Sequence, residues 1–94
     1  MVTVKFIGGL KSLTGVKAVE LPSLGMSDVT AVIRALVERY GLRLEDAIMD
    51  RETRDPRGRV LILRNGKEIG ALEGLRTLVE DGDTLVIIPV VHGG

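Results

Sequence analysis

The stretch that decides the fold is DVTAVIRALVERYG, residues 28–41. Ser27 or Asp28 can cap its first turn, and the charge of Asp28 complements the helix dipole. Gly41 follows the last apolar position, where a left-handed residue often ends a helix, and Leu42 can make the apolar contact that accompanies such an end. We therefore predict one main amphipathic helix, because its apolar residues recur at spacings of three and four: Val29, Val32, Ile33, Leu36, Val37 and Tyr40.

Strands are predicted on both sides of this helix. Residues 2–6 alternate in polarity, and residues 16–21 form a second strand that pairs with the first across a glycine-containing loop. Residues 60–63 form an apolar strand that turns at Asn65-Gly66 into residues 67–69. The last strand covers residues 84–88, and we expect it to end at Pro89 because proline cannot donate to a ladder.

This order of elements predicts an α+β fold. The sheet is expected to be mixed and to hold about five strands, with the last strand beside the first and one main helix packed on one face. A further helical turn is expected over residues 44–49, and Leu72, Leu75 and Leu78 are expected to be buried anchors. Residues 50–59 hold four arginines among acidic residues, and we favour a solvated loop over a docking or RNA contact.

The composition excludes several kinds of chemistry. The 94 residues suffice for one domain, and Lys plus Arg equals Asp plus Glu at 13 each, so direct nucleic-acid binding is not indicated. The chain has no Cys and one His, which excludes thiol nucleophiles and thiolate metal sites and leaves no catalytic or metal-ligating set. No apolar run is long enough to span a bilayer and the start does not resemble a signal peptide, so we expect a cytoplasmic monomer.

The chain ends on Gly93-Gly94, directly after an apolar strand-like run. A frayed, inert end is the ordinary interpretation of such a segment. A terminal carboxylate is ionised at neutral pH and needs activation before it can react with a nucleophile, and two residues without Cβ can enter a narrow site. We divide the chain into a domain over residues 1–89 and a flexible tail over residues 90–94, which extends roughly 17 Å.

The ending DGDTLVIIPVVHGG, residues 81–94, and the opening strand with its Leu13-Thr14-Gly15 turn resemble one known family. This is the ubiquitin-like sulfur-carrier family of β-grasp fold, which includes the small subunit of molybdopterin synthase, the thiazole-biosynthesis carrier, the ubiquitin-related modifier and the archaeal ubiquitin-like modifiers. Molybdopterin-type subunits usually carry two prolines before the tail, whereas Ile88 precedes the single Pro89 here. The ending His92-Gly93-Gly94 is closer to the ubiquitin-related modifier.

The resemblance implies that a ubiquitin-activating-type enzyme uses ATP to adenylate Gly94 and that sulfur then replaces an oxygen to give a thiocarboxylate. The protein would be a co-substrate rather than an enzyme and would hold no cofactor itself. The sulfur acceptor would be the large subunit of molybdopterin synthase or a tRNA-thiolating enzyme. Two alternatives stay open: a protein modifier joined through Gly94 to target lysines, and an interaction domain with an inert tail.

A carrier of this kind needs a docking patch, because ordering the tail costs on the order of 1–2 kcal/mol per residue. Strand alternation places Ile7, Val86 and Ile88 on the face that the helix leaves open, with Leu61 or Leu63 beside them. Scattered surface apolar residues are the alternative interpretation, and His92 is either a group that titrates near the terminus or a plain tail residue. We predict that partners contact the open face together with Pro89, Val90, Val91 and His92.

Overall fold

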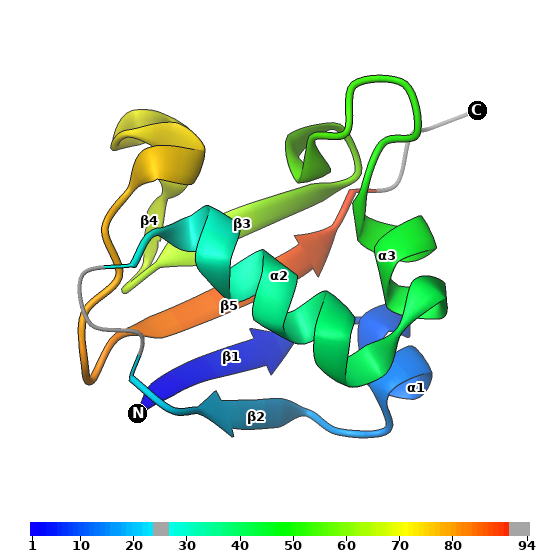
Figure 1. Ribbon diagram of the computed structural model, residues 1–94, viewed down its shortest axis with the longest axis horizontal. Helices are drawn as coiled ribbons and strands as arrows, with labels where there is room; N and C mark the ends of the chain where they lie inside the picture. Colours follow the sequence, from blue (N-terminus) through cyan, green and yellow to red (C-terminus); the bar gives the residue numbers. More distant parts are fainter. Residues whose placement is uncertain (24–26, 91–94) are drawn as a thin grey trace.

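The structure is a computed structural model that describes residues 1–23 and 27–90. Within these residues, five strands form one sheet in the order β2-β1-β5-β3-β4 (Figure 1). The α+β fold and the mixed sheet predicted from the sequence are confirmed. The strands are β1 (Val2–Phe6), β2 (Ala18–Leu21), β3 (Val60–Arg64), β4 (Lys67–Glu68) and β5 (Thr84–Pro89), and the helices are α1 (Gly9–Thr14), α2 (Val29–Tyr40) and α3 (Leu42–Ile48).

The middle strand, β5, is parallel to β1, and every other pairing among the described strands is antiparallel. β1 lies beside β5, with Thr3 opposite Thr84 and Phe6 opposite Ile87. The outer strands β2 and β4 pair with β1 and β3 respectively. The last strand therefore lies next to the first, as predicted, and β5 separates the β1–β2 pair from the β3–β4 pair.

The core lies between one face of the sheet and the helices. Figure 1 shows α2 crossing this face, with α3 continuing beyond its C-terminal end. The T-shaped contact of Phe6 with Tyr40, at 5.8 Å between ring centroids, places the end of α2 over the end of β1. The alternate strand residues and the apolar stripe of α2 are buried, among them Val2, Val4, Phe6, Ile62, Leu85, Ile87, Val29, Val32, Ile33 and Leu36.

The helix α2 starts and ends at the predicted residues, but the conformation of Gly41 at its end differs from the expected one. The backbone N–H of Ala31 donates to Asp28 Oδ1 at 3.0 Å, so Asp28 is the N-cap. Gly41 has φ 81° and ψ −163°, which is not the left-handed helical conformation, and α3 begins at the next residue. The expected apolar contact of Leu42 is wrong, because this residue opens α3 and its side chain is 74% exposed.

Three local expectations are corrected by the structure. Residues 9–14, expected as loop, form α1, in which Leu10 is buried and Thr14 Oγ1 donates to the Leu10 carbonyl. Leu78 is exposed and Val79 is buried instead, because neighbouring residues of an extended segment face opposite sides. β4 is only two residues long, since Ile69 already belongs to a 3₁₀ turn. Further 3₁₀ turns cover Pro56–Gly58 and Gly74–Arg76.

A buried carboxylate fastens the β3–β4 turn to the start of β5. Asp83 accepts hydrogen bonds from Arg64 Nε at 2.8 Å, from Asn65 Nδ2 at 2.9 Å and from the backbone N–H of Glu80 at 2.8 Å. Burial raises the pKa of Asp83, but the hydrogen bonds from Glu80, Asn65 and Arg64 together outweigh it and hold the pKa below its ordinary value of 3.8. The ionised form is therefore the one that stabilises this end of the sheet.

Within residues 1–23 and 27–90, no helix is both long enough and apolar enough to cross a bilayer.

Replacing Asp83 with asparagine should destabilise the fold by roughly 1.5–3 kcal/mol at pH 7, because it removes a hydrogen-bonded charge from a buried position. The folded-state pKa is lowered, so this contribution is present above about pH 3.8 and is lost as the pH falls below that value. Urea unfolding of wild type and Asp83→Asn should show a difference in the free energy of unfolding that is smaller at pH 3 than at pH 7. An equal difference at both pH values would contradict a stabilising role for the ionised form of Asp83.

Candidate functional site

The face of the sheet opposite the helices carries an apolar cluster at its centre. Leu61 lies opposite Ile88 and Leu63 lies opposite Val86, so the four side chains share one face of β3 and β5. Leu61 is 38% exposed, and the other three are half-buried. We call Leu61, Leu63, Val86 and Ile88 the open-face cluster.

Polar residues border this cluster on both sides. Lys5 lies beside Val86 across the parallel pair, and Glu68 lies opposite Leu63 on the other side. Exposed Ile7 follows β1 at the end of the sheet where Ile88 lies, and its backbone N–H donates to the Ile87 carbonyl at 3.1 Å. An apolar centre with a polar rim is the composition of a protein–protein interface.

The strand that carries half of the cluster is the last described element before the diglycine in the sequence. Pro89 is half-buried and Val90 is 41% exposed, and the backbone N–H of Val90 donates to the Arg59 carbonyl at 3.0 Å. The remaining residues named for the site, Val91, His92, Gly93 and Gly94, lie outside the described residues. Their roles, and the boundary between a domain over residues 1–89 and a tail over residues 90–94, stay predictions.

The last strand ends at Pro89, as expected from the sequence, but Pro89 itself still belongs to β5. It pairs with Val60 as the last residue of β5. The Ile87 carbonyl points toward β1, where it accepts from Ile7, and backbone groups two residues apart point to the same side. The nitrogen of Pro89 therefore also faces the β1 side, where the chain has already left the sheet at Gly8. A proline costs no ladder hydrogen bond at this position.

The charged loop over residues 50–59 is mostly exposed, as expected, although Pro56 is buried. Hydrogen bonds within the loop hold it together. Asp50 Oδ1 accepts from the backbone N–H groups of Thr53 and Glu52, and these bonds lower the pKa of Asp50. The guanidinium of Arg57 bonds to Asp55, at 2.7 Å for its Nη2, and lowers the pKa of that carboxyl. The loop thus has a fixed shape beside the strand that leads to the tail.

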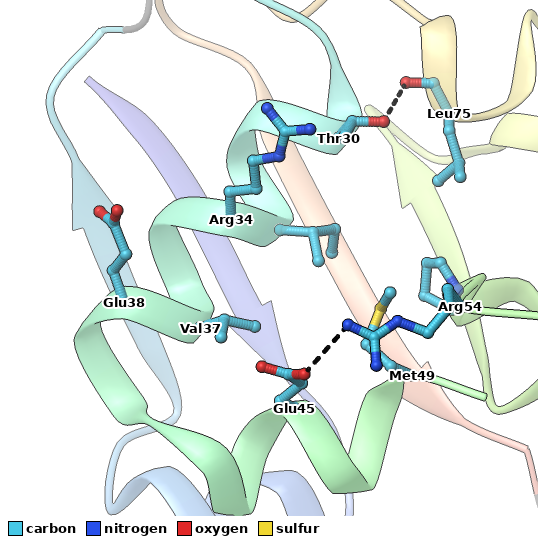
Figure 2. A pocket seen from close by; sticks show the side chains of 10 residues that line it. Thr30, Arg34, Val37, Glu38, Glu45, Met49, Arg54 and Leu75 are labelled. Atoms are coloured by element: carbon cyan, nitrogen blue, oxygen red, sulfur yellow. Dashed lines mark hydrogen bonds and ion pairs between the residues drawn. The ribbon is translucent and has the colours of Figure 1, made fainter. Parts of the chain in front are cut away.

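A hollow lies on the helix side of the molecule (Figure 2). It has a volume of about 420 Å³ between α2, α3 and the charged loop. Arg54 lies on its rim, with Nη2 at 3.8 Å from Glu45 Oε1, and Thr30 Oγ1 donates to the Leu75 carbonyl at 3.3 Å. Within the described part of the chain, no three His, Cys, Asp or Glu residues are grouped to hold a metal ion. The apolar floor is formed by Ile33, Val37, Met49, Pro56 and Leu75.

Comparison with known proteins identifies the family. Residues 4–94 match the ThiS family, and the chain therefore belongs to it. Small archaeal modifier protein 3 of Haloferax volcanii is 29% identical over 90 residues, which cover 96% of this chain and 95% of that protein. The resemblance of the sequence to the ubiquitin-like sulfur-carrier family is confirmed.

Solved structures of relatives have the same fold. The solution structure of small archaeal modifier protein 1 from Methanosarcina acetivorans matches with a TM-score of 0.83 and 33% identity, covering 99% of this chain and 95% of that one. A chain of the BexX/CysO complex of Amycolatopsis orientalis matches with a TM-score of 0.79 and 29% identity, covering 100% of both chains. The β-grasp fold predicted from the sequence is confirmed.

Replacing a side chain with alanine should cost less stability on the open face of β3 than on its buried face. We expect Leu61→Ala to lower the free energy of unfolding by less than about 1 kcal/mol, because the side chain is already partly in water. Ile62→Ala should cost about 2–5 kcal/mol, because Ile62 is 1% exposed and its loss leaves a cavity. Urea unfolding of both variants measures the difference, and similar losses would mean that the open face is held for stability rather than for contact.

Proposed function

We propose that this protein is a sulfur carrier whose Gly94 carboxylate is activated by a ubiquitin-activating-type enzyme and converted to a thiocarboxylate. The observation that supports this most is the course of β5. This strand carries Val86 and Ile88 of the open-face cluster, and Gly93 and Gly94 follow three and four residues after Val90 in the sequence. In this member of the ThiS family, the strand that supplies half of the proposed contact surface therefore lies only a few residues before the proposed reactive end in the sequence.

The proposed chemistry has two steps. A carboxylate oxygen of Gly94 attacks the α-phosphorus of ATP, and pyrophosphate leaves with its electron pair to give an acyl-adenylate. A sulfide donor then attacks the acyl carbon, and AMP leaves with the carboxyl oxygen that bridged to phosphorus. Activation is needed because the carboxylate, with a pKa near 3.5, is ionised at neutral pH and is a poor electrophile.

This chain contributes a substrate to those steps rather than a catalytic group. Gly93 and Gly94 have no Cβ, so the acyl carbon can be approached in a narrow site. The four residues beyond Val90 span roughly 13–14 Å when extended, enough to reach into a partner while the globule stays outside. The protein would therefore be a co-substrate that holds no cofactor, and its dependence on ATP would place its use in the cytoplasm.

The open-face cluster would supply the affinity for the activating enzyme. Threading the tail into an active site costs on the order of 1–2 kcal/mol per ordered residue. Burying Leu61, Val86 and Ile88, together with Ile7, would offset this cost, since apolar area gains about 25 cal/mol per Å² when removed from water. The same face would later dock on the sulfur acceptor, either a molybdopterin synthase large subunit or a tRNA-thiolating enzyme.

A second candidate function is supported by the relatives. One similar protein is named small archaeal modifier protein 3, and a similar structure is that of small archaeal modifier protein 1. In this alternative, a lysine amine of a target protein attacks the activated acyl carbon of Gly94, and an isopeptide bond forms. Both functions share the acyl-adenylate and differ only in the second nucleophile.

Intact-protein mass spectrometry tests the reactive end. The protein is incubated with a ubiquitin-activating-type enzyme, ATP and a sulfide source. We expect a mass gain equal to one oxygen replaced by sulfur, and no gain when Gly93 and Gly94 are deleted. Adenylation without sulfur entry would favour the protein modifier. An unchanged mass with every activating enzyme tried, or the same gain in the truncated chain, would refute the proposal and favour an inert tail.

Replacing Ile88 with lysine tests the docking surface. A charge in the open-face cluster should weaken binding to the activating enzyme by about 10-fold or more. The lysine ammonium would lose its water on binding without gaining a partner of opposite charge in the interface. Leu42→Lys is the matched control, since it makes the same change at an apolar residue that is exposed on α3. Affinities measured by calorimetry should separate the two variants, and equal affinities would place the contact elsewhere.

A further inference from the structure

The residues at which the tail leaves the sheet are held from both sides. We call Pro89 and Val90 the tail root. On the β3 side, the Arg59 carbonyl accepts the Val90 N–H at 3.0 Å. On the β1 side, Gly8 lies against the proline ring, and a Cβ on Gly8 would be 3.7 Å from Pro89 Cγ. The last described residues of the chain therefore lie between the segment at Arg59 and the segment at Gly8.

Each of these two segments is itself anchored to a helix. Arg59 Nη2 donates to the Asp46 carbonyl in α3 at 2.9 Å, and the backbone N–H of Arg59 donates to the Pro56 carbonyl at 2.9 Å. Gly8 has φ 60° and ψ −136°, a conformation that residues with a Cβ rarely adopt. Its carbonyl accepts the N–H of Lys11 at 3.0 Å in α1. The tail root therefore lies against supports that do not depend on the tail.

We propose that Arg59 is a positioning residue for the reaction at Gly94, acting through Val90, with Gly8 as the support on the opposite side. This inference rests on the proposed function and adds to it the residues that aim the tail. The side chain of Arg59 ties the start of β3 to α3, and its carbonyl fixes the direction in which the chain passes Val90. No contact of Arg59 with the partner is required.

This arrangement lowers the conformational entropy that is lost when the chain enters the active site. Because Pro89 and Val90 are already held by their neighbours, binding does not have to order these two residues. Loosening the tail root adds the cost of ordering them and spreads the positions that the acyl carbon samples in the complex, which slows a reaction that depends on alignment. Docking through the open-face cluster is left as it was.

The test compares Arg59→Ala, Arg59→Lys and Arg43→Ala in steady-state thiocarboxylate formation. Arg59→Ala should lower kcat about threefold to tenfold with KM changed less than twofold, because alignment is lost and docking is kept. Arg59→Lys should recover most of the rate, since an ammonium can donate to the Asp46 carbonyl. Arg43→Ala removes an exposed arginine from α3 and should behave as wild type. Unchanged kcat in Arg59→Ala, or a rise in KM alone, would overturn the positioning role.

A second readout does not depend on the reaction. Hydrogen exchange of the Val90 amide, measured by nuclear magnetic resonance, should be faster in Arg59→Ala than in wild type and unchanged in Arg43→Ala. Equal exchange in all three proteins would refute the inference even if the carrier reaction proceeds. If exchange differs as expected and wild type forms neither adenylate nor thiocarboxylate, the proposed function fails while the support of the tail root by Arg59 stands.

Discussion

The parallel pairing of β1 with β5 is the constraint on which the rest of the structure depends. Thr3 lies opposite Thr84, so the first strand of the described chain pairs with the last one, which is the middle strand of the sheet. Such a pairing closes a very long loop, and its entropic cost is met only when the core between sheet and helices also forms. The pairing also determines where β5 ends, because two parallel strands run in the same direction and the C-terminal end of β5 therefore lies beside that of β1.

Local patterns were sufficient to predict the regular elements. The apolar stripe from Val29 to Tyr40 predicted α2, and the polar residues before it left Ser27 and Asp28 as the candidate N-caps. Alternation in β1 and β5 predicted which residues are buried. Local patterns failed where tertiary contacts decide the conformation. The six-residue α1 is too short to be stable by propensity, and it forms because Leu10 is buried in the core. The side on which Leu78 lies could not be inferred from an irregular segment.

The candidate site likewise has parts that local sequence predicts and parts that only tertiary contacts determine. The positions of Ile7, Leu61 and Ile88 on the open face followed from strand parity, which needs no knowledge of the partner strands. The hollow on the helix side and the bond from Arg59 to Asp46 join elements that are distant in sequence, and no spacing rule reveals them. A weak signal existed for Gly8, because a glycine directly after a strand often marks a backbone conformation that other residues avoid. Nothing local connects it to Pro89.

The short outer strands have a consequence for how the molecule behaves at high concentration. A sheet with an uncovered apolar face risks growing by strand addition at its edges. Here the edges are β2, with four residues, and β4, with two, and both carry charged side chains such as Glu20 and Lys67. Neither edge offers a long template for another strand. The apolar face can therefore stay open to partners without making the protein prone to fibre formation.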